Sequence, residues 1–128
     1  MTLILDSGGI SALAGQRARL AELRRRAMWP PQIPAVVLAE VLTGDHRRDF
    51  HEHQLIRLCQ VRTVTEQLAR EAAVLRTRSG RAASISATDA IVAAYAISCA
   101  EPTILTSDPD DLAALTAHHT AAVTIARA

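Results

Sequence analysis

The sequence contains no lysine. All 14 of its basic residues are arginine, set against 13 acidic residues, so the formal net charge is +1. This absence excludes two classes of protein that place an aspartate after a strand, phosphatases of the haloacid dehalogenase type and receiver domains, because both use a lysine at their sites. The Gly-Lys-Ser/Thr motif of P-loop kinases is also missing, which excludes that class.

Aromatic residues, cysteines and long apolar runs are scarce as well. Only 2% of residues are aromatic, so the core must consist mainly of aliphatic side chains and alanine. The two cysteines, Cys59 and Cys99, lie in apolar surroundings without the spacing of a metal or redox motif. We interpret them as reduced thiols, with a disulfide as the alternative. No apolar run reaches the roughly 18–20 residues of a membrane span. The short apolar stretch near the N-terminus has no basic residues before it, so a secretory signal is not expected. We therefore expect a cytoplasmic protein.

Apolar segments with strand character alternate with segments of helical periodicity along all 128 residues. This order predicts a single α/β domain over 1–128, with a short parallel sheet of about four to five strands and helices on both faces. An alanine-rich helix that begins at Ser86 or Thr88 is apolar nearly all round, so we expect it at the centre. The expected strands cover 2–6, 32–33, 61–64, 103–106 and 122–126, and the expected helices cover 9–14, 16–28, 34–42, 46–59, 65–78, 86–100 and 109–117.

Four acidic residues occupy positions where a folded chain rarely places a charge. Asp6 and Asp108 follow two expected strands, and Glu40 and Asp89 lie at helical spacing from apolar residues, on the side of their helices that faces the core. Acidic side chains are seldom buried without a partner that offsets desolvation. Carboxylates without a suitably placed histidine or cysteine favour Mg²⁺ or Mn²⁺. The four acids together predict a divalent metal site at the carboxyl edge of the sheet.

Three of the four acids also have a simpler interpretation. Asp6 and Asp108 are acceptable N-caps, and an acid in the first turn of a helix, such as Asp89, is favoured by the helix dipole. Glu40 has no such explanation. If all four bind metal, the remaining charge is 14 − 9 = +5, which suits binding to a phosphate backbone. A drift in genomic base composition would explain most of the arginines equally well.

Four segments of the chain resemble the signatures of PIN-domain ribonucleases, in the same order and at similar spacing. More narrowly, the chain resembles a VapC-type toxin of a bacterial toxin–antitoxin pair. The segments are Leu3-Ile4-Leu5-Asp6-Ser7, Pro34-Ala35-Val36-Val37-Leu38-Ala39-Glu40-Val41, Thr88-Asp89-Ala90-Ile91-Val92 and Ile104-Leu105-Thr106-Ser107-Asp108.

The resemblance implies a PIN-like fold and an endoribonuclease. In such enzymes the acids that correspond to Asp6, Glu40, Asp89 and Asp108 bind one or two Mg²⁺ or Mn²⁺ ions, and metal-activated water hydrolyses an RNA phosphodiester bond. It also implies a homodimer and a small antitoxin protein that covers the site. An apolar groove near residues 9–28 would suit an antitoxin segment.

Further residues are weaker candidates. Ser7 and Thr106 match small hydroxyl positions that hold a water or a phosphate, and Asp110 is a lesser candidate for the metal site. Asp111 is equally ambiguous, because both acids suit the first turn of a helix. Gly8-Gly9 departs from the commonest pattern of the family. We expect RNA-backbone contacts from three arginines around Gly80, with a solvated helix end as the alternative: Arg76, Arg78 and Arg81.

One rival from a different class remains. A PIN-like module that binds RNA or a protein without cutting would share the fold and most of these motifs. The complete set of four acids argues against it.

Overall fold

Five parallel strands form one sheet in the order β3-β2-β1-β4-β5 within residues 1–120 and 122–128, which the computed structural model describes. The predicted parallel α/β sheet is confirmed. The strands are β1 (Thr2–Leu5), β2 (Gln32–Pro34), β3 (Gln60–Arg62), β4 (Pro102–Thr106) and β5 (Thr124–Arg127), and the helices are α1 (Ser7–Leu13), α2 (Arg17–Arg24), α3 (Val37–Val41), α4 (Phe50–Leu58), α5 (Glu66–Arg78), α6 (Ala87–Ile97) and α7 (Pro109–Thr116).

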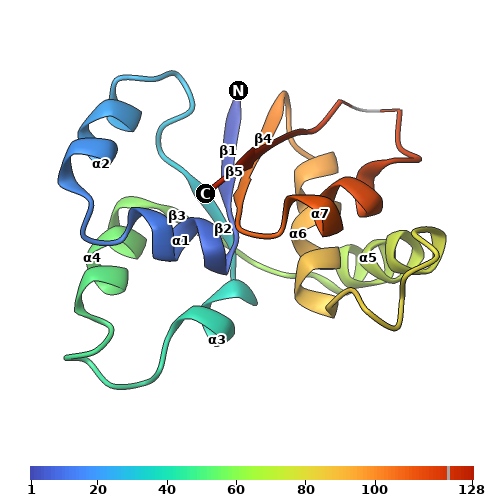
Figure 1. Ribbon diagram of the computed structural model, residues 1–128, viewed down its shortest axis with the longest axis horizontal. Helices are drawn as coiled ribbons and strands as arrows, with labels where there is room; N and C mark the ends of the chain where they lie inside the picture. Colours follow the sequence, from blue (N-terminus) through green and yellow to red (C-terminus); the bar gives the residue numbers. More distant parts are fainter. Residues whose placement is uncertain (121) are drawn as a thin grey trace.

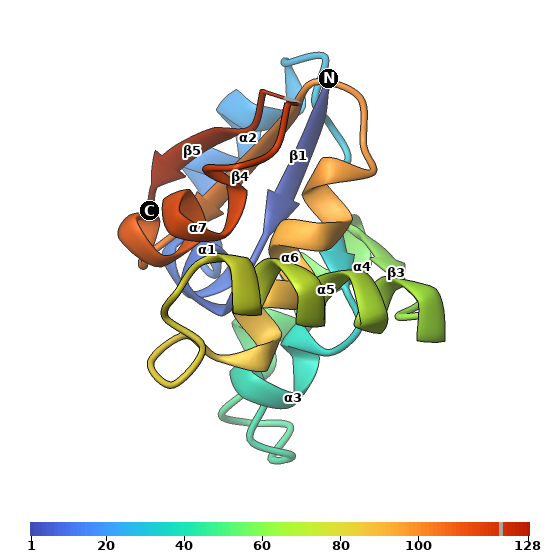
Figure 2. The ribbon, with the colours of Figure 1, turned by 90° about the vertical axis from the view of Figure 1, so that its right-hand side faces the viewer.

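Helices cover both faces of the sheet, as expected. Figure 1 shows α1, α2 and α4 on one side of the central strands and α5, α6 and α7 on the other. The short helix α3 lies beyond the end of the sheet at which β1 runs into α1. Figure 2, turned by 90°, shows α7 beside β5. No helix in the described part of the chain is long and apolar enough to cross a membrane.

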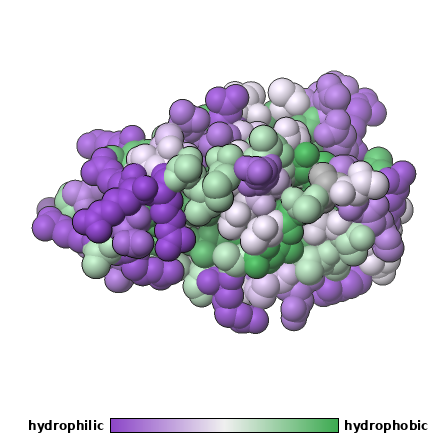
Figure 3. Space-filling view, turned by 90° about the horizontal axis from the view of Figure 1, so that it is seen from above, coloured by the Kyte–Doolittle hydropathy of each residue, from purple (hydrophilic) through white to green (hydrophobic). Residues whose placement is uncertain are grey.

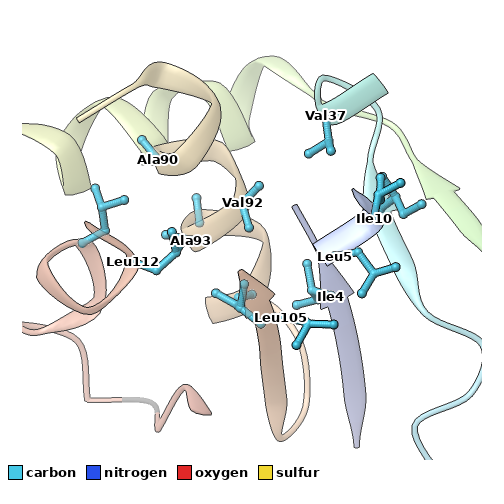
Figure 4. Close-up of a cluster of buried hydrophobic side chains, with 14 of the residues drawn as sticks. Ile4, Leu5, Ile10, Val37, Ala90, Val92, Ala93, Leu105 and Leu112 are labelled. Atoms are coloured by element: carbon cyan, nitrogen blue, oxygen red, sulfur yellow. The ribbon is translucent and has the colours of Figure 1, made fainter. Parts of the chain in front are cut away.

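The core is built from aliphatic side chains on both faces of β1 and β4. Ile4 and Ile104 are fully buried in these strands, and Figure 4 shows Ile4, Leu5 and Leu105 between the side chains of α1 and those of α6. The small side chains of α6 allow close packing against α5, α7 and β4. The central position predicted for this helix is confirmed, because four of its alanines are buried: Ala90, Ala93, Ala94 and Ala96.

The surface at the opposite end of the sheet, where β1 begins, is seen in Figure 3. Hydrophilic residues gather at the two ends of this view, and hydrophobic surface lies between them. Both cysteines are free thiols, half-buried against the core, and burial raises the pKa of Cys59 to about 12. A thiol with so high a pKa is inert, which agrees with its interpretation as a core residue.

Several predicted boundaries are wrong by a few residues. The helix expected at 46–59 begins only at Phe50, because the buried Asp49 carboxylate accepts hydrogen bonds from the backbone amides of Thr43 and Gly44 and holds the preceding residues in turns. The helix expected at 16–28 ends at Arg24, and residues 25–28 form turns and a bend. The last strand begins two residues later than expected, at Thr124.

The glycine pair after Asp6 is required by close packing. Helix α1 begins at Ser7 and therefore contains both glycines, two residues earlier than expected. A Cβ at Gly8 would lie 2.7 Å from the backbone nitrogen of Ser107, and a Cβ at Gly9 would overlap the carbonyl oxygen of Leu105. The absence of both side chains lets the first turn of α1 rest directly on the end of β4.

We predict that Gly9→Ala destabilises the protein by about 1–3 kcal/mol, because the added methyl group must displace backbone. This loss runs against helix propensity, which favours alanine over glycine by about 1 kcal/mol. Urea unfolding measures the difference. The exposed Ser11→Ala in the same helix is the control and should change stability by less than about 0.5 kcal/mol. Equal stability of Gly9→Ala and the wild type would contradict the packing argument.

Candidate active site

Asp6 is the buried centre of the acidic cluster, with 3% of its surface exposed. It leaves β1 in extended conformation and caps α1, since its Oδ1 accepts a hydrogen bond from the Gly9 amide at 2.8 Å. Burial raises the pKa of Asp6, and the negative charges of Asp108 and Glu40 raise it further. Hydrogen bonds from Thr106 and Gly9 oppose these effects but do not cancel them. The protein therefore holds a carboxylate where its charge is unfavourable.

Thr106 connects two of the acids. The register pairs Leu5 with Leu105, so Thr106 lies level with Asp6 in the neighbouring strand. Its hydroxyl hydrogen bonds to the Asp6 carboxylate and accepts a hydrogen bond from the Asp108 amide at 2.9 Å. The side chain is fully buried and already engaged, so this position supports a role in holding the acids rather than a contact with substrate.

Asp89 is half-buried in the first turn of α6. The N-cap Ser86 accepts a hydrogen bond from the Asp89 amide at 3.0 Å, which fixes the start of the helix. Burial raises the pKa of the Asp89 carboxyl to about 6, and the charges of Asp6, Asp108 and Glu40 contribute to the rise. The four acids are therefore close enough for the charges of the other three to raise the pKa of Asp89.

Glu40 and Asp108 lie at the rim and are exposed, so the expectation that Glu40 lies on a buried helix face is wrong. The reason is that α3 lies beyond the end of the sheet, where the inner side of the helix opens into a cleft. Glu40 Oε2 accepts a hydrogen bond from the Ser7 hydroxyl at 3.2 Å. The Asp108 side chain makes no capping bond to α7, so the simple N-cap interpretation does not explain its carboxylate.

The four acids surround the carboxyl edge of the sheet but do not form a closed ligand cage. Within residues 1–120 and 122–128, no three acidic, histidine or cysteine side chains are close enough, as oriented, to hold one metal ion. The donor chemistry nevertheless fits a hard divalent cation, which prefers carboxylate oxygens. Burial and the neighbouring negative charges raise the pKa values of Asp6 and Asp89, so a bound cation would stabilise both carboxylates in their charged form.

Two open clefts lie beside the acids, and the smaller one is largely polar. One cleft of about 510 Å³ lies between α1 and α3, and Glu40, Ser7 and Ser107 line it. A second, of about 250 Å³, lies on the α7 side of Asp108. Ser107 borders both, so the residue between Thr106 and Asp108 separates the two clefts.

The predicted arginines separate into different environments. Arg76 Nε donates to the carbonyl oxygen of Ile85 at 2.7 Å and ties the loop before α6 to α5. Arg78 lines an apolar cleft with Val74 and Ile97 that contains none of the four acids. Only Arg81 is near the cluster, where its guanidinium forms a 2.7 Å ion pair with Asp111.

The ion pair with Arg81 also bears on the two ambiguous acids. It engages Asp111 as a structural partner, whereas Asp110 remains exposed in the cleft beside Asp108. Sequence reasoning missed one residue of this cleft, Arg127 at the end of β5. Its position depends on the pairing of β5 with β4, which no local motif reveals.

Comparisons with known proteins agree with this arrangement. Residues 4–117 match the PIN domain, and the chain belongs to that family. PIN domains are generally nucleases, and they typically use divalent metal ions. The crystal structure of FitAcB from Neisseria gonorrhoeae has the same fold, with a TM-score of 0.67 and 22% sequence identity over 98% of this chain and 96% of that one. No curated protein matches the sequence.

We predict that Asp89→Asn is more stable than the wild type near neutral pH when EDTA removes divalent cations. The folded-state pKa of about 6 lies above the ordinary value of 3.8, so the folded protein loses stability as pH rises between these two values. The neutral amide avoids that loss. Thermal unfolding from pH 3.5 to 8 measures the difference, which should be greatest above pH 6 and vanish below about pH 4. A variant less stable at pH 7.5 would contradict the electrostatic account.

Proposed function

We propose that the protein is a metal-dependent endoribonuclease that acts in the cytoplasm as the toxin of a toxin–antitoxin pair. One observation carries the proposal: a PIN domain places a buried, charge-destabilised Asp6 within electrostatic reach of Glu40, Asp89 and Asp108. Burying like charges together costs stability. A domain of this family that retains such a cluster is best explained by a cation that the carboxylates bind.

Each acid has a distinct part in the proposed site. Asp6 and Asp89 supply the inner carboxylates, and Glu40 and Asp108 supply ligands from the rim. A bound Mg²⁺ or Mn²⁺ lowers the pKa of a water molecule and neutralises charge on a phosphoryl group. Thr106 and the Gly9 amide orient Asp6, and the Ser7 hydroxyl orients Glu40.

RNA is the proposed substrate and reaches the acids through the two clefts that meet at Ser107. The proposal extends to a homodimer. A small antitoxin protein would prevent cleavage by covering the site, and an antitoxin arginine is the natural counter-charge to the acid cluster.

A groove between α2 and α4 suits the antitoxin segment. It has a volume of about 530 Å³, its apolar floor contains Leu20 and Leu55, and Arg17 and Arg57 lie beside it. Phe50 and Leu58 border this groove with 54% and 37% of their surfaces exposed, so two large hydrophobic side chains face solvent at the same place. An amphipathic segment with acidic flanks would cover this surface.

A second candidate function is a PIN module that binds RNA or a protein without cutting. One observation favours it: among the described residues no three acids are oriented to hold a metal ion. The cleavage experiment below decides between the two.

We predict that the purified protein cleaves cellular RNA into discrete fragments with Mg²⁺ or Mn²⁺ and not with EDTA. Asp6→Asn and Asp89→Asn should each lower the rate on the order of a hundredfold or more, because each removes a ligand of the cation. Gel analysis of the fragments measures the rate. Glu71→Gln, an exposed acid on α5, is the matched control and should cleave like the wild type.

Two outcomes would contradict the proposal. Cleavage that persists in both aspartate variants would indicate a contaminating nuclease. No cleavage by folded protein that binds Mn²⁺ would favour the non-cutting module.

We further predict that Phe50→Asp weakens binding of the proposed antitoxin on the order of a hundredfold, because a charge replaces an apolar anchor in the groove. Calorimetric titration of the purified partners measures the affinity. Val74→Asp is the control, since Val74 is similarly exposed, at 47%, but lies on α5 across the sheet. Equal effects of the two substitutions would exclude this groove as the antitoxin site.

A further inference from the structure

The cleft on the α7 side of Asp108 contains an arginine that the proposed chemistry does not yet use. Strand β5 pairs with β4 so that Arg127 lies level with Thr106, two residues before Asp108. The Ala128 amide donates to the Thr106 carbonyl oxygen at 2.7 Å and fixes the backbone at this point. The Arg127 side chain lines the same 250 Å³ cleft as Asp108 and Asp110.

The charges of this cleft are unevenly paired. Arg81 is held by Asp111, so these two side chains neutralise each other. Among the described residues, no acidic group lies within ion-pair distance of Arg127, although the side chain is exposed and close to two aspartates. An arginine beside a proposed metal ligand is therefore available for an anion that enters the cleft.

An RNA strand that approaches Asp108 meets a local electrostatic problem. Its phosphates carry the same sign of charge as Asp108 and Asp110, and like charges at short range repel strongly near a protein surface. A cation on the same wall offsets that repulsion. The guanidinium group suits this task, because it presents a planar fork of donors that binds phosphate oxygens bidentately.

We propose that Arg127 is a substrate-positioning residue that binds a backbone phosphate of single-stranded RNA on the α7 side of Asp108, next to the phosphate that is cut. The inference rests on the proposed nuclease function and adds to it the path of the strand. RNA enters along the cleft between β5 and α7, passes Asp108 and continues past Ser107 into the cleft beside Glu40. Arg81, fixed by Asp111, forms the far wall of the entrance.

Salt dependence of binding tests this assignment, because a phosphate contact releases counterions and a structural role does not. The probe is fluorescein-labelled oligo(U), titrated by anisotropy, and every protein in this assay carries Asp6→Asn to prevent cleavage. Arg127→Ala should weaken binding roughly tenfold, as expected for one solvent-exposed, charge-assisted phosphate contact. The slope of log affinity against log salt should fall in magnitude by about 0.7.

Two further variants make the test specific. Arg127→Lys retains the charge and should restore the slope but not the full affinity, since lysine lacks the bidentate fork. Arg25→Ala removes an exposed arginine beyond α2 and should leave affinity and slope unchanged. In the otherwise wild-type enzyme, Arg127→Ala should raise KM and leave kcat nearly constant, as expected for lost uniform binding.

The outcomes separate this inference from the function on which it rests. If the wild type cleaves RNA but Arg127→Ala has an unchanged salt slope and KM, the positioning role is wrong and the nuclease stands. If the wild type does not cleave RNA and the Asp6→Asn protein does not bind oligo(U), the proposed function is wrong and the role of Arg127 is overturned with it.

Discussion

The structure depends on one unfavourable interaction, the burial of the Asp6 carboxylate beside three other acids. Desolvation and like charge both raise the pKa of Asp6, and the same two effects bring the pKa of Asp89 to about 6. The protein reduces this cost with neutral donors only, the Thr106 hydroxyl and the Gly9 amide. No basic side chain is hydrogen bonded to any of the four acids in the described part of the chain, so their charge remains available for a divalent cation.

The backbone around Asp6 is arranged to keep that carboxylate in place. Gly8 and Gly9 let the first turn of α1 approach the end of β4 so closely that a Cβ at Gly9 would collide with Leu105 of the strand, and a Cβ at Gly8 with Ser107 just after it. Thr106, level with Asp6 in β4, then fixes the Asp108 amide through its own hydroxyl oxygen. The packing of α1 against the end of β4 therefore also sets the relative positions of Asp6 and Asp108. A stability cost at the site is offset by the aliphatic core and the alanine-rich α6 beneath it.

The sequence predicted the elements of the fold well, because alternating apolar runs and helical periodicity are local signals. It also singled out the four acids: Asp6 and Asp108 follow strands, Asp89 begins a helix, and Glu40 was noticed for its spacing from apolar residues. Their role as metal ligands stays a prediction. It did not predict that Glu40 is exposed, since the position of α3 beyond the sheet is set by tertiary packing. The role of Gly8 and Gly9 and the place of Arg127 were equally hidden, because both depend on pairings between β4 and distant segments. The late start of α4 followed from Asp49, whose capture of two loop amides no periodicity reveals.

The central claim is that the four carboxylates form a cation site, and direct binding of Mn²⁺ tests it without any assumption about substrate. Electron paramagnetic resonance measures free Mn²⁺ as protein is added, and thermal unfolding in the same buffer reports the stabilisation that a native-state ligand must produce. The account predicts that Mn²⁺ binds the wild type and raises its Tm, and that Asp6→Asn loses most of both effects. Equal binding and equal stabilisation of the wild type and Asp6→Asn would contradict it.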